Sequence, residues 1–417
     1  MNAVFSGVFR SPALGAATML TAGGFGFVLG NILLARLMLA EEYGALTLFF
    51  ALTQVGLTVG PLGLEIVINR HQLDAAPPLL ARALPSSLAA GVAMSLIGAV
   101  FYDLGFTLCV CLALAAAGAS MTRIASAFLQ SHERFGQSLL LLQLHNYVVV
   151  AGVPVLMVLG RADALPVGVL VASAYAATGA IGWIVGSRLP ARGGSALPPG
   201  ALSREGLATV GIGLAIQLLW QLERLVIPRA LSVAALGSFA VIASVAASPF
   251  RMMQTGVGYT LLPGLRRAED KAAMKRLIYR EAKAVAAVAV AAIAALLFVT
   301  PFVMDRVLSG RYDFSFALLA AVIAAGLFKL WSGFTSATVQ AVGSSRQLAM
   351  LNFASWGGVA VGVPAAVAGG AFGLSGVVWG AASGWLVPAA VGTVLSIRAI
   401  RRADPYLGAP SAVRASD

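Results

Sequence analysis

A succession of long apolar segments constrains the fold of this chain more than any other feature. Crossing the core of a bilayer, about 30 Å thick, takes roughly 20 apolar residues per helix. The segment from Gln347 to Ile397 holds no charged residue and is too long for one such helix, so we place a turn at Gly369 and Gly370. With 59% hydrophobic and 11% charged residues and a mean hydropathy of +0.90, the chain lies outside the usage of soluble proteins. It is predicted to be a polytopic membrane protein.

Charged or Pro/Gly-rich breaks divide the apolar sequence into six candidate spans in each half. In the first half they are 12–35, 43–68, 83–101, 104–128, 138–159 and 166–186. In the second half they are 207–227, 235–262, 283–304, 314–341, 347–368 and 373–397. The predicted fold class is therefore all-α, with about twelve transmembrane helices in two six-helix lobes. Kinks are expected at the prolines inside spans, which are Pro61, Pro154, Pro249, Pro364 and Pro388.

The break at 187–206 divides the chain into two nearly equal halves. It contains three arginines and three prolines, a composition typical of a solvated linker. We predict an N-terminal lobe over 1–186, a cytoplasmic linker over 187–206, a C-terminal lobe over 207–402 and a cytoplasmic tail over 403–417.

The two halves share weak but ordered similarities. Arg36 and the pair Tyr43-Gly44 have the spacing of Arg229 and the pair Leu236-Gly237, at an offset of 193 residues. Further on, a glutamine followed by Gly-Val-Pro occurs in both halves at an offset of 210 residues, at 130 and 152–154 and again at 340 and 362–364. The common order and nearly constant offset indicate an internal duplication.

The distribution of basic residues predicts the orientation in the membrane. Twelve spans place both termini on one side, and the loops of that side hold twenty Lys and Arg residues against six on the other. Basic residues accumulate in cytoplasmic loops, so both termini and the central linker are predicted to be cytoplasmic. The net charge of +12 follows from this topology and gives no reason to expect a nucleic-acid partner.

The segment from Leu265 to Lys283 carries seven basic residues among good helix formers. We predict that it forms an interfacial helix leading into the ninth span. Its expected role is that of an anchor that touches anionic membrane lipid, and a specific regulatory site is the alternative.

Groups suited to catalysis are nearly absent from the sequence. His71, His132 and His145 are scattered, and no nucleophile, base and acid have plausible spacing. Cys109 and Cys111 lie in an apolar run and give no disulfide or metal framework. We therefore predict that the protein is not an enzyme and uses no metal or cofactor.

Basic residues inside spans are the strongest candidates for a binding site, because a charge at that depth is costly unless it has a function or a partner. Arg251 and Lys329 lie deep in spans of the second half, and Arg123 lies in the inner half of the fourth span. The alternative for Arg251 and Lys329 is a structural pairing with a carboxylate or with carbonyls freed by Pro249.

Acidic residues in spans are candidates for ion coupling or charge pairing. Glu65 lies towards the inner end of the second span, and Glu223, beside Arg224, lies near the outer end of the seventh. Amide side chains within spans would add a hydrogen-bonding lining if they face inward; they are Asn31, Gln54, Gln143, Gln217, Gln221, Gln254 and Gln340.

Residues 33–71, with Arg-x6-Tyr-Gly followed by Gly-Leu-Glu, resemble the opening of bacterial O-antigen and capsule polysaccharide flippases. Residues 220–268 are similar to the matching segment after their seventh helix, and the likeness covers nearly the whole chain. These flippases belong to the multidrug/oligosaccharidyl-lipid/polysaccharide exporter superfamily. The resemblance implies two six-helix lobes around a central cavity that opens to either side of the bacterial inner membrane in turn.

The resemblance also implies the cargo, an oligosaccharide linked to undecaprenyl pyrophosphate, for O-antigen, lipopolysaccharide or exopolysaccharide biosynthesis. Arg251, Lys329 and Arg123 would bind its pyrophosphate through charge-assisted hydrogen bonds. None of the three matches a family motif. Candidate partners are the lipid-linked substrate, membrane lipids, a polysaccharide polymerase and a chain-length regulator.

Two other functions are weighed against this one. A cation-coupled multidrug exporter of the same fold commonly has an acidic residue in its first helix, and residues 12–35 contain none. A membrane polymerase or ligase would be expected to carry a sizeable periplasmic loop with catalytic groups, and the loops predicted on that side are short.

Overall fold

The computed structural model describes residues 26, 28–71, 73, 77–160, 163–189, 199–268 and 270–402. These residues form helices joined by short turns, with no strand among them. Eight helical segments of this part of the chain are long and apolar enough to cross a membrane, or nine with the bent pair α10 (Val233–Ala246) and α11 (Ser248–Arg266) taken as one span. The predicted all-α polytopic membrane fold is confirmed. Most of the predicted span 12–35 lies outside the described residues, which show an apolar helix over Val28–Leu37.

Contacts between residues divide the chain into two compact units, Met1–Val241 and Ile242–Asp417. The helix α9 (Pro199–Ala230) packs against α3 (Ala40–Val59) and belongs to the first unit. Residues 190–198 of the predicted linker and the tail from 403 onward lie outside the described residues. The predicted lobe boundaries and the cavity between the lobes stay predictions.

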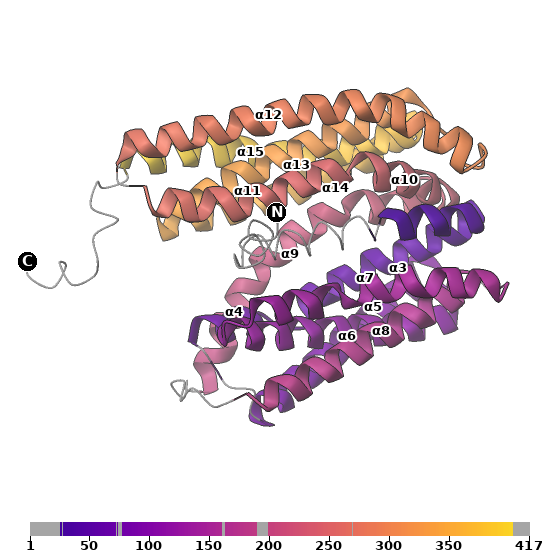
Figure 1. Ribbon diagram of the computed structural model, residues 1–417, viewed down its shortest axis with the longest axis horizontal. Coiled ribbons are helices and arrows are strands. Elements are labelled where there is room, and N and C mark those ends of the chain that lie inside the picture. The colour runs from indigo at the N-terminus through magenta and orange to yellow at the C-terminus, as the bar shows by residue number, and fades with distance from the viewer. Residues whose placement is uncertain are drawn as a thin grey trace, which may run out of the picture. The chain divides into compact units, whose positions relative to one another are not determined.

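The first unit is built around α6 (Phe106–Ser131), which has a larger share of buried residues than α3 (Ala40–Val59). It is surrounded by α3 and by the helices α4 (Leu64–His71), α5 (Pro77–Tyr102), α7 (Phe135–Val158) and α8 (Ala164–Ser187). Figure 1 shows α5, α6 and α8 side by side in this unit. Small residues let these helices approach: a methyl group at Gly91 of α5 would lie 2.3 Å from the carbonyl oxygen of Ala113 in α6.

Two spans that the sequence presents as single stretches are interrupted. The span predicted over 43–68 ends as α3 at Val59 and resumes as α4 at Leu64, because Leu62 and Gly63 adopt φ values of 49° and 75°, which no helix accommodates. The span predicted over 235–262 bends by 52° between α10 and α11. Pro61 and Pro249, two of the expected kink positions, lie at these breaks.

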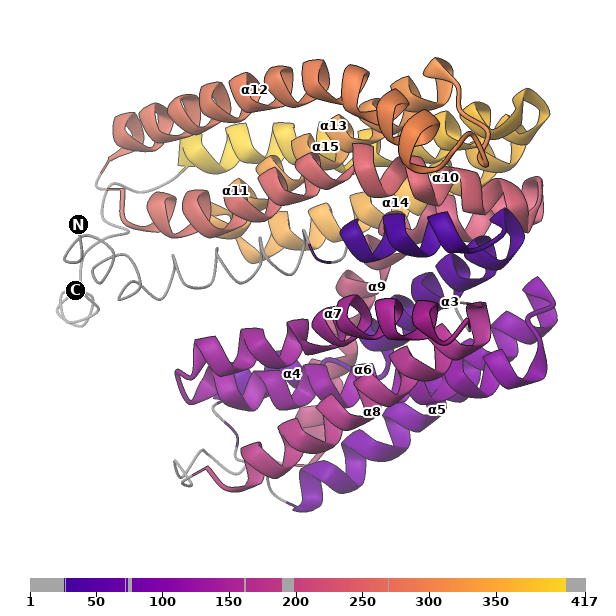
Figure 2. The same ribbon diagram turned by 45° about the vertical axis from the view of Figure 1, so that its right-hand side comes forward.

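In the second unit α13 (Phe316–Val342), α14 (Ser345–Gly369) and α15 (Gly373–Arg402) pack closely, and α11 lies along α13. Figure 2 shows α12 (Lys271–Phe302) on the outside of this group. The turn expected at Gly369 and Gly370 is confirmed: the short helix Gly370–Phe372 follows α14, and Gly373 has a φ of 73°.

The helix predicted over 265–283 is interrupted between Arg266 and Lys271, but from Lys271 it leads into the ninth span as expected, and its place at the membrane interface stays a prediction. The segment divides between α11, which ends at Arg266, and α12, which begins at Lys271 after Asp270, whose side chain caps it by accepting from the Ala273 amide. From there α12 continues unbroken for 32 residues to Phe302, because nothing before Pro301 interrupts its run of good helix formers. The basic residues from Lys271 onward therefore lie in the first turns of a candidate spanning helix.

The proposed duplication has a structural counterpart at two equivalent glycines. A methyl group at Gly44 would lie 2.0 Å from the carbonyl oxygen of Val233, and one at Gly237 would lie 2.1 Å from that of Ala40. Gly44 of α3 therefore meets the carbonyl at the start of α10, and Gly237 of α10 meets the carbonyl at the start of α3. The first turns of the two helices cross in a reciprocal contact. Such symmetric contacts are expected where two copies of a duplicated helix pack against each other.

Candidate functional site

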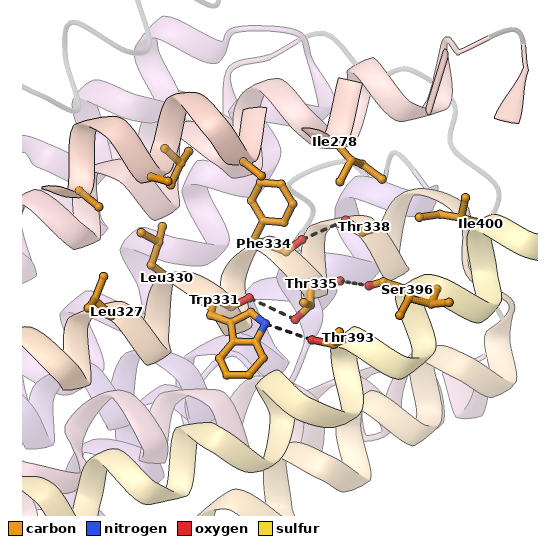
Figure 3. Close-up of a pocket in the computed structure, with 15 residues that line it drawn as sticks. Ile278, Leu327, Leu330, Trp331, Phe334, Thr335, Thr338, Thr393, Ser396 and Ile400 are labelled. Carbon is orange, nitrogen blue, oxygen red and sulfur yellow. Dashed lines mark hydrogen bonds between the residues drawn. The ribbon is translucent and has the colours of Figure 1, made fainter. Parts of the chain in front are cut away.

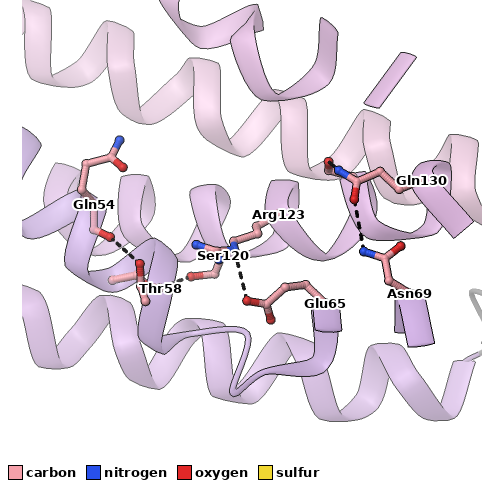
Figure 4. A network of polar contacts seen from close by, with 9 residues as sticks. Gln54, Thr58, Glu65, Asn69, Ser120, Arg123 and Gln130 are labelled. Carbon is pink, nitrogen blue, oxygen red and sulfur yellow. Dashed lines mark hydrogen bonds and ion pairs between the residues drawn. The ribbon is translucent and has the colours of Figure 1, made fainter. Parts of the chain in front are cut away.

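A polar row along α6 holds the charged pair of the first unit. The side chain of Arg123 on α6 lies 3.1 Å from the carboxylate of Glu65 on α4 (Figure 4). The break after α3 offsets α4 from the line of that helix and brings Glu65 to this position. Both residues were selected from the sequence for their charge, and their pairing neutralises each within the unit.

Neutral groups continue the row along the same helix. Ser120 donates to the carbonyl oxygen of Gly56 in α3 at 3.0 Å, and Asn69 of α4 donates to Gln130 at 3.1 Å (Figure 4). Gln130 in turn donates to Ser138 of α7 at 3.0 Å. One stripe of α6 therefore joins three neighbouring helices through polar contacts. We did not select Ser120, Asn69 or Ser138 from the sequence, although the recurrence of polar residues at 120, 123 and 130 on one helix face was a visible signal.

The remaining selected groups of the first unit lie around α3, α8 and α9. Glu223 of α9 is 2% exposed, and Arg224 donates to Gln221 one turn earlier at 3.0 Å. Near the start of α3, the hydroxyl of Tyr43 donates to Asn31 at 2.9 Å, so this selected amide is held inside the unit.

An aromatic contact accounts for the buried histidine of the first unit. His145 of α7 stacks on Tyr175 of α8 with ring centroids 4.3 Å apart, and Gln54 donates to the Tyr175 hydroxyl at 3.5 Å. The neighbouring amide Gln143 accepts from Asn146 at 2.8 Å. His145 therefore packs between α7 and α8.

In the second unit, Arg251 of α11 and Lys329 of α13 lie at a similar height along two adjacent helices. On α11, Phe250 lies against Gly326 and Gln254 lies against Gly333 of α13, which sets Arg251 beside the turn that carries Lys329. Arg251 is exposed on the surface of its unit, and Lys329 is partly buried. The ammonium group of Lys329 lies 5.9 Å from the ring centroid of the buried Trp385 of α15, a cation–π distance.

The cysteines serve packing in this arrangement. Cys109 and Cys111 are free and buried in α6, and the Cys109 thiol donates to the carbonyl oxygen of Leu104 at 3.3 Å. Among the described residues no group of three His, Cys, Asp or Glu side chains has the geometry of a metal site.

Comparison with known proteins first gives a sequence match. The profile of a family described as polysaccharide biosynthesis protein matches residues 33–317. No curated protein matches the chain in sequence.

Solved structures match over nearly the whole chain. A multidrug resistance MATE family transporter of the MOP superfamily, in an inward-facing conformation, is 15% identical with a TM-score of 0.64, over 93% of this chain and 98% of its own. The lipid II flippase MurJ, in an inward closed conformation, is 11% identical with a TM-score of 0.68, over 92% of this chain and 87% of its own. An outward-facing MATE transporter is 16% identical with a TM-score of 0.56, over 98% of both chains. At these identities the likeness establishes the fold.

Proposed function

The chain belongs to the family of polysaccharide biosynthesis proteins, and on this premise we propose that it is a flippase and not an enzyme. Its cargo is an oligosaccharide linked to undecaprenyl pyrophosphate, which it carries across the bacterial inner membrane by alternating access. The fold that it shares with membrane transporters supports this proposal, since MurJ is named a lipid II flippase.

The observation that carries the proposal is the pair of cations at one level of the second unit. Arg251 and Lys329 lie on adjacent helices within the membrane-spanning part of the chain. A pyrophosphate offers several strong acceptor oxygens, and hydrogen bonds between ionised groups are stronger than neutral ones, the more so where water is scarce. The two cations hold the pyrophosphate of the cargo during its passage.

Arg123 plays a different part in this proposal, because its guanidinium already has an anionic partner in Glu65. A phosphate that reaches Arg123 competes with the carboxylate, and release of Glu65 leaves it available to take up a proton or cation. The Arg123–Glu65 pair is thus our first candidate for coupling cargo to an ion. Glu223 and Arg224 of α9 are the second candidate pair.

The biological role is tested by deletion of the gene. We expect the strain to stop exporting a surface or secreted polysaccharide and to accumulate lipid-linked repeat units inside the inner membrane. The measurement is extraction of the lipid-linked intermediates with analysis of surface polysaccharide, before and after complementation. Normal polysaccharide in a clean deletion strain without a redundant homologue contradicts the proposal, and altered drug tolerance in its place favours the multidrug exporter. A partner polymerase and chain-length regulator would be sought in the same pathway.

The orientation is tested at the predicted linker. With both termini cytoplasmic, a cysteine introduced as Ser195→Cys in a variant that lacks Cys109 and Cys111 is expected to react with membrane-impermeant maleimide only after the inner membrane is opened. A cysteine introduced as Ser309→Cys, in the loop after α12, serves as the periplasmic control and is expected to react in intact spheroplasts. Labelling of residue 195 in intact spheroplasts overturns the orientation.

A further inference from the structure

Helices α12, α13 and α15 of the second unit border a groove. Helix α5 packs tightly on α6, where Gly91 allows the backbones to meet. The corresponding third helix of the second half, α12, rests on α11 and does not pack closely against α13 over their whole described length.

The space left between α12, α13 and α15 is a groove with a volume of about 440 Å³. It runs from Leu327 at one end to Ile278 and Ile400 at the other (Figure 3). This volume lies within the range of sites that hold small organic ligands, about 300 to 1,000 Å³. Two residues of the groove lining, Trp331 and Ile397, are 42% and 47% exposed, so the groove opens to the apolar surface of the unit.

The wall of the groove is suited to hydrocarbon and not to sugar. Its hydroxyl and indole groups already donate hydrogen bonds inside the protein, as Figure 3 shows for those drawn there. The donors and their acceptors are Trp331 to Thr393, Thr335 to the carbonyls of Trp331 and Ser332, Thr338 to that of Phe334, Thr393 to that of Ala389, and Ser396 to that of Thr335. A sugar would find no donor here, whereas an alkyl chain needs none.

Cations lie beyond the end of the groove marked by Ile278 and Ile400. On α12, Lys271 and Lys275 lie on the face that continues into the groove, seven and three residues before Ile278. On α15, Arg401 follows Ile400, and its carbonyl oxygen accepts from Lys271 at 3.1 Å, which joins the two helix ends. Of the carboxylates that the structure describes near this end, Glu281 lies 3.2 Å from Arg280 and Asp270 caps α12.

We propose that this groove binds one anionic phospholipid, with an acyl chain between α12 and α13 and its phosphate against Lys275 and Arg401. The cations at the helix ends attract the anionic headgroup, and the apolar wall of the groove contacts the acyl chain. A phospholipid is favoured over the polyprenyl chain of a cargo because the groove opens to the apolar surface of the unit and the cations beyond its end are exposed. The site does not depend on the identity of the transported substrate.

The test uses the full chain, purified in neutral detergent and titrated with phosphatidylglycerol or phosphatidylcholine. Retained lipid is counted by native mass spectrometry, and affinity is followed by the shift of the thermal midpoint. We expect one phosphatidylglycerol per chain and at least tenfold weaker binding of phosphatidylcholine. Equal binding of the two lipids contradicts the role of the cations.

Two double variants distinguish specific binding at the groove from unspecific attraction of the lipid to the basic residues of α12. Lys275→Gln with Arg401→Gln is expected to weaken phosphatidylglycerol binding about 25-fold, at about fivefold for each cation near the headgroup. Arg267→Gln with Arg276→Gln removes the same charge from exposed positions off the groove face, before the start of α12 and on its opposite side, and is expected to leave binding close to that of the wild type. Equal weakening by both pairs means that the lipid only adsorbs to a basic surface, which overturns the proposal.

The chain site is tested by filling the groove. Ala286→Trp places an indole among the lining residues, and we expect loss of the retained lipid, whereas Ala287→Trp on the opposite face of α12 retains it. If Ala286→Trp is not recovered as folded protein, Ala286→Met occupies the same space with a flexible side chain. Lipid retained by the filled variant contradicts the proposal. So does displacement of phosphatidylglycerol by an equimolar polyprenyl phosphate, which would assign the groove to the cargo.

Discussion

Replacing Arg251 and Lys329 together with glutamine is expected to abolish export while membrane-inserted protein remains at its normal level. Glutamine keeps polarity and approximate length but removes the charge at both positions. Hydrogen bonds to a charged group contribute about 1.5 to 3 kcal/mol each, so the loss of two lowers affinity for a pyrophosphate by more than about 100-fold. Export is measured by complementation of the deletion strain, and folded protein by size-exclusion chromatography of a fluorescent fusion.

Two controls distinguish a binding role from a structural one. Arg267→Gln removes an exposed cation beyond the end of α11 and is expected to leave export unchanged. Lys329→Arg keeps the charge over the ring of Trp385 and is expected to retain most of the export. Unchanged export from the double glutamine variant would sink the binding hypothesis. Loss of the folded protein in that variant, with normal folding of Lys329→Arg, would assign the charges to stability.

The helices could be predicted closely from the sequence, because a spanning helix depends on the local length and hydropathy of its own segment. The turn at Gly369 and Gly370 is the clearest case, since both the absence of charge around it and the need for a break were visible in the sequence. The helix predicted over 265–283 shows the limit of this local reasoning. Its composition favoured one helix, but the structure interrupts it between Arg266 and Lys271, and from Lys271 no breaker follows until Pro301.

The contacts of the candidate site could not be predicted in this way, because they depend on how helices cross. Arg123 and Glu65 were both selected, yet their pairing requires the break between Val59 and Leu64, which depends on the backbone of Leu62 and Gly63. The groove beside α12 likewise results from the spacing of two backbones. The sequence shows α12 as a long apolar helix, but its separation from α13 appears only in the structure.

Alanine at Gly44 or at Gly237 is expected to lower the thermal stability of the protein sharply. Each new methyl group would lie 2.0 or 2.1 Å from a backbone carbonyl oxygen, and a helix backbone cannot yield as the end of a flexible side chain does. Overpacking of this kind costs about 1 to 3 kcal/mol, occasionally more. The thermal midpoint of the purified chain is the measurement. Gly256→Ala is the matched control, because nothing lies within 4 Å of a methyl group there, and it is expected to be neutral or slightly stabilising.

The double variant Gly44→Ala with Gly237→Ala tests whether the two glycines form one crossing. Because each contacts the first turn of the other's helix, moving α3 and α10 apart to admit one methyl group also makes room for the second. The double variant should therefore be less destabilised than the sum of the single variants, as coupled neighbours are. Effects that add fully would mean that each glycine meets its carbonyl independently. Sub-additive effects would show that the two glycines act as a single packing element.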